Sequence, residues 1–432
     1  MDITTLSNEQ LLQLARDNVA SFPQNENLYD PNEAAYLRGL YSIATHGRVK
    51  MSRPGQATIS MPGTRAEFDL TDGKIPLLRS KKIFFRSFLI ENQWFLSGSD
   101  DVAFLKERNV SIWDSWVIPS TAVFEPTEKQ TGFDVETYIR CHYPEVFKAL
   151  VKYKAKMAIS IPTFAQMQDF IASYTNQFAE LNEETVQLGN IPKVRLAGGK
   201  IGAGAYGPAW RKWEDVRLRM DRPVGNEHKA LLARGFKSVS EDALIDDSDP
   251  MAWGDFYSRV IDQFGDAIKM LRTGADSRRI IVSAWNAAKI DEAALPPCHS
   301  WFQFVSYDNF DGGPRDLVCV LMQRSADHPC GTPFNVAQYA ALTHLVAKIT
   351  NHRAVKLVLN IGDDHIYADQ VPLLKEQFNR TPIGLPCATM RIPDSVKELD
   401  DFINLPEDEL IGMIHGYEEG SYHPRIDYPV AV

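Results

Sequence analysis

Cys298 has the setting in this sequence that best suits nucleophilic chemistry. It follows two prolines in LPPCHSWFQF and stands before a β-rich run, which would hold its thiol at the mouth of a strand. The attacking form of a cysteine is the thiolate, which nearby arginines favour. Taken alone, a cysteine in such a place is more often a core residue, and Cys319 in LVCVLM is expected in the core.

Polar residues that would serve this thiol gather in three motifs. DSRRIIVSAWN sets two adjacent arginines before a β-rich run, LMQRSADHPCGTPFN sets a polar group after a strand, and LNIGDDHIYADQ adds a histidine and a tyrosine. Earlier in the chain, Glu91 interrupts the apolar helical pattern SFLIENQWFLSG. A lone acid on an apolar face is costly unless it is paired, so Glu91 is as much a site candidate as a structural residue.

The elements that must position these residues follow from the hydrophobic pattern. A helix is predicted from Ala34 to Gly47, a hairpin over 57–70, strands at 280–284, 301–307, 316–323 and 356–361, and a long helix after Asn335. Gly202 to Gly207 match GxGxxG formally. The sequence then runs into Pro208 and two tryptophans rather than into the pattern of a dinucleotide site, so a loop is expected there.

Composition sets wider limits. The chain has 432 residues, with 46 Lys+Arg, 56 Asp+Glu and a net charge of −10, which counts against a general nucleic-acid coat because such a protein needs a basic surface. No apolar run reaches the roughly 18 residues of a membrane helix. Five widely spaced cysteines, without CxxC or HExxH, favour a reduced, cytosolic protein without a structural zinc.

A series of motifs resembles, in order, thymidylate synthase and the related pyrimidine-nucleotide hydroxymethylases: RPGQAT, FDLTDGKIPLLRSKK, SFLIENQWFL, VSIWDSW, AYGPAWRKW, DSRRIIVSAWN, LPPCH, QRSADHPCGTPFN, GDDHIY and the final PVAV. The resemblance implies an α/β fold with a large twisted mixed sheet flanked by helices, and two subunits packed sheet against sheet. It divides the chain into an N-terminal extension (1–32), a catalytic domain (33–118 and 198–432) and an inserted, mostly helical segment (119–197). The added length is compatible with a viral or other specialised enzyme of nucleotide metabolism. A cytoplasmic location is expected, in the host cell if the enzyme is virus-encoded.

The resemblance also implies a chemistry and a set of roles. The family binds a pyrimidine nucleotide and the co-substrate 5,10-methylenetetrahydrofolate, uses no metal, and adds a cysteine, here Cys298, to C6 of the base so that C5 becomes a nucleophile. Further catalytic roles would fall to Glu91, Tyr206, Arg324 and Asp327. The nucleotide would be bound by Arg53, Gln323, Arg324, Ser325, Asn335, His365 and Tyr367, and by Arg278 and Arg279 from the other subunit of a homodimer. The folate would contact Lys81, Ile112, Trp113, Trp116, Leu295, Asp327, Gly331, Phe334, Val430 and Ala431.

Asn335 would select the base. Its amide offers one donor and one acceptor, which match N3–H and O4 of uracil, whereas the related deoxycytidylate enzyme carries Asp here, so dUMP is the expected substrate. His299 would act either on the substrate or through a neighbour. The chain departs from the family in having Asn360 where histidine is usual and Cys330 where leucine is usual.

Three activities stay open. The first is synthesis of dTMP with release of dihydrofolate, the second is hydroxymethylation of dUMP by water with release of tetrahydrofolate, and the third is a catalytically silent nucleotide- or RNA-binding relative. Retention of Cys298, Glu91, Tyr206 and the arginines argues against the third. Trp113 and the terminal PVAV favour the first over the second, because both would help to exclude water from the reactive intermediate. No membrane and no stable nucleic-acid partner is expected.

Overall fold

The computed structural model describes residues 3–52, 55–117, 185–188, 191–194, 199–219, 226–238, 255–273, 276–290, 293–310 and 312–430. Two compact units divide the chain: the first comprises Met1–Trp116, Ile201–Lys212 and Asp262–Val432, and the second comprises Val117–Lys200 and Trp213–Ile261. In the expected insert, β3 (Thr185–Leu188) and β4 (Ile191–Val194) pair as antiparallel strands. The helices predicted there lie outside the described residues, and the division into extension, catalytic domain and insert stays a prediction.

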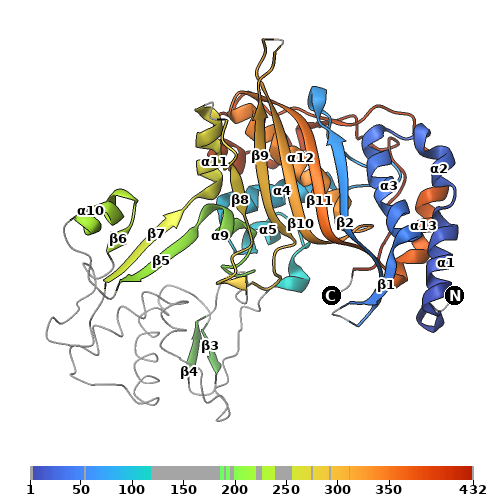
Figure 1. Ribbon diagram of the computed structural model, residues 1–432, viewed down its shortest axis with the longest axis horizontal. Helices are drawn as coiled ribbons and strands as arrows, with labels where there is room; N and C mark the ends of the chain where they lie inside the picture. Colours follow the sequence, from blue (N-terminus) through green and yellow to red (C-terminus); the bar gives the residue numbers. More distant parts are fainter. Residues whose placement is uncertain are drawn as a thin grey trace. The chain divides into compact units, whose positions relative to one another are not determined.

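The first unit is built on a six-stranded mixed sheet with the strand order β1-β2-β11-β10-β9-β8 (Figure 1). Its strands are β1 (Arg48–Met51), β2 (Ala57–Asp69), β8 (Ile281–Ser283), β9 (His299–Tyr307), β10 (Arg315–Asp327) and β11 (His352–Tyr367). β10 and β11 are parallel, and the other neighbouring pairs of this sheet are antiparallel. Helices flank the sheet, which confirms the expected α/β class with a large mixed sheet.

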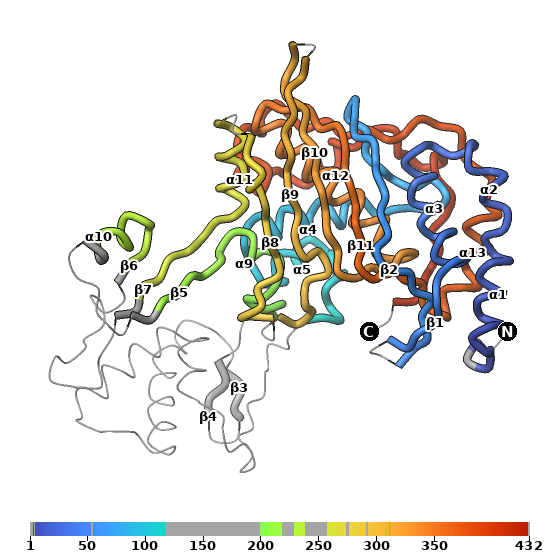
Figure 2. Tube along the Cα trace, in the orientation of Figure 1, coloured from blue at the N-terminus to red at the C-terminus, as the bar shows by residue number. Residues whose placement is uncertain are grey.

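The helix α12 (Thr332–Ile349) contacts β10, β11 and a second helix, α4 (Phe85–Ser97). Almost all of its residues are buried, as expected of a helix that is apolar around most of its circumference. It begins a few residues before the predicted start because Pro333, which lacks an N–H, fits the first turn of a helix. Figure 2 traces α4 and α12 on the same side of the strands.

A second group of helices lies beyond the β1–β2 edge of the sheet (Figures 1 and 2). The helix α3 (Pro31–His46) is capped by Asp30, whose carboxylate accepts from the N–H of Asn32 at 2.9 Å, and it ends before Gly47 as predicted. Helix α1 (Asn8–Val19) starts at a capping box on Ser7 and packs on α3 and on α13 (Val371–Asn379). The first α-helix of the described chain therefore packs both on a helix close to it in sequence and on a helix more than 350 residues later.

The hairpin predicted over 57–70 is wrong. Residues Ala57–Asp69 form the single strand β2, which pairs with β11 on both sides of Gly63. Gly63 has a positive φ of 71°, yet Pro62 and Thr64 keep their partners Asp363 and Ile361. Pairing along the whole of a long neighbouring strand therefore outweighs the local tendency of Pro-Gly to turn.

The second unit contains a three-stranded sheet in the order β5-β7-β6, from β5 (Trp213–Arg219), β7 (Asp255–Ile261) and β6 (Lys237–Ser238), with α10 (Asn226–Ala233) beside it. Leu231, Phe236 and Tyr257 form its described core. Within the part of the chain that the structure describes, no helix has the length and apolar character needed to cross a membrane.

Candidate active site

Cys298 immediately precedes β9, and Arg324 of β10 fixes the turn that carries it. The backbone N–H of Arg324 donates to the Cys298 carbonyl oxygen at 2.8 Å. The guanidinium donates to the carbonyl oxygens of Pro296 (2.7 Å) and Pro297 (3.0 Å), and its Nη2 lies 3.7 Å from Cys298 Sγ. One arginine thus holds both prolines and stands beside the thiol.

The surroundings act on the Cys298 thiol in two directions. Burial raises its pKa, because the thiolate loses solvation, and the charge of Arg324 opposes that rise without cancelling it. The described cysteines are all free thiols, and burial also raises the pKa values of Cys319, Cys330 and Cys387. Among these four thiols, only that of Cys298 has an arginine nitrogen recorded within contact distance of its sulfur.

Tyr206 approaches Cys298 from another segment of the chain, at the start of α9 (Tyr206–Arg211). Its hydroxyl accepts the backbone N–H of Cys298 at 2.7 Å, and its ring stacks on Phe95 at 4.8 Å between centroids. A Cβ on Gly207 would lie 2.8 Å from the Ser99 carbonyl oxygen, so that residue must be small. Gly202 and Gly204 lie in a loop, as expected, whereas Tyr206 and Gly207 begin the helix α9, which the loop interpretation did not predict.

Glu91, on α4, accepts two hydrogen bonds. Trp113 Nε1 donates to its Oε1 at 2.6 Å, and Gln338 Nε2 of α12 donates to its Oε2 at 2.8 Å. Burial nevertheless raises the pKa of Glu91 to about 7, against the lowering effect of both donors. A carboxyl group with such a pKa exchanges its proton near neutral pH, as a general acid or base must. The Trp113 ring lies edge-on to that of Tyr206, with 5.9 Å between the ring centroids. Because Trp113 bonds to Glu91 and Tyr206 bonds to Cys298, these two rings connect the surroundings of the carboxyl group with those of the thiol.

His299 and Gln323 lie opposite each other in the β9–β10 register, next to Cys298. Burial lowers the pKa of His299 to about 4, and interaction with the Asn335 side chain only partly opposes it, so the ring is neutral at neutral pH. Gln323 is fully buried, and neither polar atom of its amide has a hydrogen-bond partner within the described residues. Unpaired buried amides are costly, so Gln323 suits a role toward a bound ligand.

The ends of the parallel strands β10 and β11 bring together further predicted site residues. Ser325 pairs with Asp363 and Asp327 with His365, and Tyr367 ends β11 with its ring edge-on to His365 at 5.1 Å. Asp327 Oδ2 accepts from Gln370 Nε2 at 2.9 Å. Strand register therefore brings the predicted nucleotide contacts Ser325, His365 and Tyr367 and the predicted folate contact Asp327 to one end of the sheet.

Lys81, a predicted folate contact, is enclosed by the protein. It is buried, donates to the carbonyl oxygen of Pro329, and lies over the ring of Tyr428 at 4.8 Å. Burial lowers the pKa of Lys81 to about 8, although Cys330 and Asp327 oppose this. Lys81 thus lies against the C-terminal segment and near Asp327.

Other predicted residues are less closely tied to the Cys298 group. Arg278 and Arg279 are exposed in the turn before β8, and Ile112 is 46% exposed. Trp116, Leu295, Gly331 and Phe334 are partly buried, and Val430 is exposed. Arg53 and Ala431 lie outside the described residues. Two partners were missed by sequence reasoning, Gln338 and Gln370, because a glutamine inside or beside a helix carries no local signal of its target.

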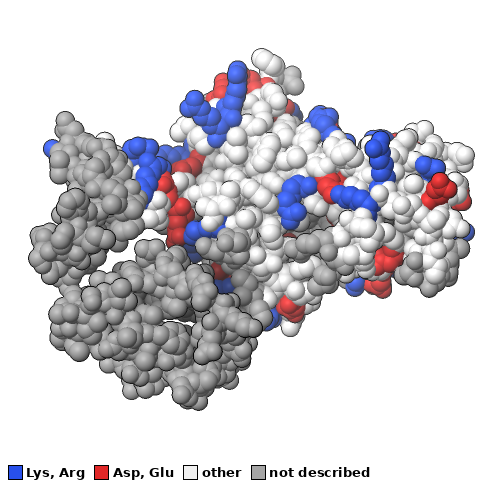
Figure 3. All heavy atoms as spheres, turned by 60° about the horizontal axis from the view of Figure 1, so that its bottom comes forward, with Lys and Arg blue, Asp and Glu red and all other residues white. Residues whose placement is uncertain are grey.

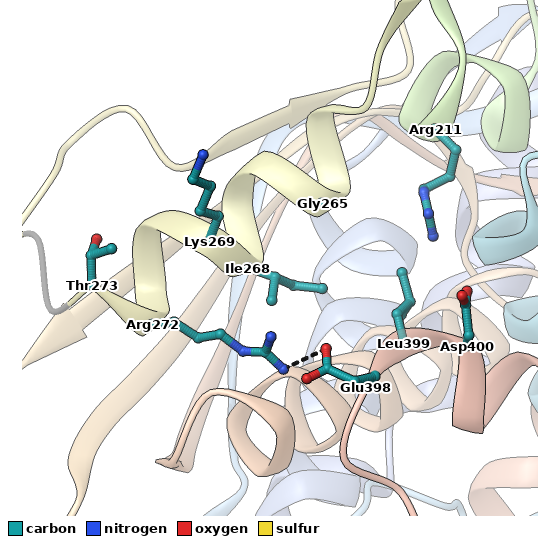
Figure 4. Close-up of a pocket in the computed structure, with 9 residues that line it drawn as sticks. All are labelled: Arg211, Gly265, Ile268, Lys269, Arg272, Thr273, Glu398, Leu399 and Asp400. Atoms are coloured by element: carbon teal, nitrogen blue, oxygen red, sulfur yellow. Dashed lines mark hydrogen bonds and ion pairs between the residues drawn. The ribbon is translucent and has the colours of Figure 1, made fainter.

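A surface groove of about 450 Å³ lies between α11 (Gln263–Arg272) and the start of α14 (Leu399–Ile403), and none of the predicted site residues lines it (Figure 4). Arg272 donates to Glu398 at 2.7 Å, and Arg211 pairs with Asp262 at 2.9 Å. Both arginines thus have protein partners.

On the face shown in Figure 3, acidic side chains stand beside several of the basic groups of the described residues.

A thiol beside an arginine and a buried carboxyl group with a pKa near neutrality form a candidate active site, and comparison with known proteins shows the family of the chain. A family model described as thymidylate synthase matches residues 34–432. Thymidylate synthases of two Listeria monocytogenes strains, serotypes 4b and 4a, are 30% and 31% identical over 347 and 345 residues, covering 80% of this chain and 85% of each relative. The chain belongs to the thymidylate synthase family.

Proposed function

We propose that this protein transfers a one-carbon unit from 5,10-methylenetetrahydrofolate to C5 of dUMP and releases dTMP and dihydrofolate. The observation that carries the proposal is the contact of Arg324 with the Cys298 thiol, with the Tyr206 hydroxyl on the backbone of the same cysteine. The Cys298 sulfur adds to C6 of the base, which turns C5 into a carbon nucleophile. The folate supplies the one-carbon unit and, in this reaction, the hydride.

The residues of this chain fit both substrates by their chemistry. Arg324 and Ser325, with Arg53 and with Arg278 and Arg279 of a second subunit, bind the phosphate, for which arginine forks are well suited. The unpaired amide of Gln323 and the amide of Asn335 provide hydrogen bonds toward the nucleotide. Asp327, Trp113 and the C-terminal segment hold the folate.

In this proposal, Glu91 and Tyr206 order water molecules and take part in proton transfers. The Glu91 carboxyl, whose pKa is raised to about 7, exchanges a proton during formation and breakdown of the adduct. The neutral His299 orients the Asn335 amide, so its role is exerted through a neighbour.

The test is to identify the products that the full chain forms from dUMP and methylenetetrahydrofolate. dTMP with dihydrofolate supports the proposal, whereas 5-hydroxymethyl-dUMP with tetrahydrofolate would assign the hydroxymethylase reaction instead. Cys298→Ser is expected to abolish turnover and the covalent complex with 5-fluoro-dUMP and folate. A Ser variant that still forms this complex at the wild-type level would exclude Cys298 as the nucleophile.

A further inference from the structure

Gln370 connects three segments of the proposed folate side. It ends the short 3₁₀ helix Ala368–Gln370, directly after β11, and it is fully buried. Its Nε2 donates to Asp327 Oδ2 at 2.9 Å and to the Pro429 carbonyl oxygen at 2.8 Å. Its Oε1 accepts from the backbone N–H of Tyr367 at 2.9 Å. One amide therefore bonds to the end of β10, the end of β11 and the C-terminal segment.

The Gln370 amide favours the ionised form of Asp327. Burial raises the pKa of the Asp327 carboxyl, and the largest opposing effect is the hydrogen bond from Gln370, followed by the charge of His365. The backbone N–H of Cys330 donates to the other carboxylate oxygen at 3.2 Å. Without the Gln370 donor, Oδ2 of a buried carboxylate would lose its recorded protein partner, which is costly.

The C-terminal segment is held next to the same amide. Tyr428 is buried, and its hydroxyl donates to Gln377 Oε1 at 2.8 Å. Pro429 follows, and because proline has no N–H, its backbone can be fixed by hydrogen bonding only through the carbonyl that Gln370 binds. Beyond Pro429, Val430 is exposed. Within the described residues, the hydrogen bond from Gln370 to the Pro429 carbonyl oxygen is therefore the one nearest the C-terminus.

We propose that Gln370 is a positioning residue, whose amide keeps the Asp327 carboxylate and the Pro429 segment in one arrangement so that the folate pocket forms as a unit. This inference rests on the proposed function, because it concerns the binding of the second substrate. Gln370 acts through Asp327 and the C-terminal segment and does not itself touch the reacting atoms.

Gln370→Glu tests the proposal, because it keeps the side-chain length and the acceptor for Tyr367 but removes both donors. We expect the KM for methylenetetrahydrofolate to rise roughly tenfold or more, as for loss of hydrogen bonds to a charged group. The Kd for dUMP alone should stay within about twofold, because the Tyr367 contact is kept. Gln370→Met, which also removes the donors but adds no charge, should change the folate KM in the same direction.

Gln93→Glu is the matched control. Gln93 is also a buried glutamine whose Nε2 donates to two backbone carbonyl oxygens, those of Phe402 (2.9 Å) and Leu405 (3.0 Å). Its substitution should carry a similar folding cost and leave the folate KM unchanged. This separates a general effect of losing a buried amide from a specific effect on the folate side.

The outcomes distinguish the two proposals. If the wild-type protein forms neither product, the proposed function fails, whatever the variants do. If the wild-type protein is active and the Gln370 variants keep the wild-type folate KM, the positioning role is excluded. It is also excluded if dUMP and folate affinities fall together in Gln370→Glu, which keeps the acceptor for Tyr367. The same holds if both Gln370 variants fail to fold while Gln93→Glu folds, because Gln370 would then act through stability alone.

Discussion

Gly39 of α3 lies so close to His328, the residue after Asp327, that a Cβ on Gly39 would be 2.5 Å from the ring carbon Cε1. The ring cannot move away freely, because its Nδ1 lies 2.8 Å from Asp364 Oδ1 and its Nε2 donates to the Tyr36 carbonyl oxygen at 3.1 Å. The packing of an N-terminal helix thus fixes His328, which directly follows Asp327 at the end of β10.

Gly39→Ala should therefore destabilise the protein by about 1–3 kcal/mol, the usual cost of overpacking a core. Gly412→Ala is the matched control, since Gly412 also lies in a helix and a Cβ there would meet nothing within 4 Å. Urea unfolding of both variants gives the two free energies. Equal stabilities would show that the His328 ring adapts to the added methyl group.

Arg324 should set the reactivity of the Cys298 thiol. Because the guanidinium charge opposes the burial-induced rise in the Cys298 pKa, Arg324→Gln should move the pH midpoint of Cys298 alkylation upward. Arg324→Lys keeps the charge and should move the midpoint less. The modified residue is identified by peptide mass spectrometry. An unchanged midpoint in Arg324→Gln would remove the electrostatic role of this arginine.

Glu91 should make stability fall with rising pH. Its carboxyl has a pKa of about 7 in the folded state against an ordinary value of 4.5, so between these values the folded state keeps a proton that the unfolded state has lost. Over this window the free energy of unfolding of the wild-type protein should fall by on the order of 1–3 kcal/mol relative to that of Glu91→Gln, whose side chain cannot titrate. Urea unfolding at pH 5 and pH 7.5 measures the difference. A constant difference between the two proteins would mean that the Glu91 pKa is not raised.

Asn335 should select uracil over cytosine. In Asn335→Asp, a carboxyl group replaces the amide that matches the uracil edge, so kcat/KM for dUMP should fall by roughly 100-fold or more and activity on dCMP should rise. Asn360→Asp provides a control for the same chemical change on β11, where Asn360 Nδ2 makes only a 3.4 Å contact with the Leu321 carbonyl oxygen. Unchanged preference for dUMP in Asn335→Asp would count against the role.

Trp113 should control the fate of the methylene intermediate through water exclusion. Trp113→Leu opens space beside Glu91 and should raise the ratio of 5-hydroxymethyl-dUMP to dTMP several-fold. Trp113→Phe removes the 2.6 Å hydrogen bond to Glu91 but keeps an aromatic ring, so it should change the rate more than the ratio. Mass spectrometry of both products gives the ratio. If Phe and Leu shift the ratio equally, the hydrogen bond and not the ring determines it.

The sequence predicts best the elements with a long apolar periodicity. Helix α4 around Glu91 and helix α3 up to Gly47 are predictable because apolar spacing and end signals agree. The Pro62–Gly63 pair is misleading, because a local turn preference carries no information about the long partner strand β11.

For the candidate site, motifs identify Cys298 and Arg324, but they do not reveal which neighbours hold them. The bond from Gln338 to Glu91 joins residues 247 positions apart in the chain, and that from Gln370 to Asp327 joins residues 43 apart. Such pairings depend on the packing of α12 on α4 and on strand register, so no local pattern encodes them.

The order of segments along the chain has a practical consequence for any shortened form of this protein. The second unit is made of two separate stretches, and Ile201–Lys212, which carries Tyr206, belongs to the first unit and runs between them. Excision of the second unit thus requires two independent deletions, each closed by its own linker, one joining Trp116 to Ile201 and the other joining Lys212 to Asp262. A single cut from Val117 to Ile261 would discard Tyr206 as well. A minimal version of this protein therefore has to be spliced from three pieces, with the middle piece kept.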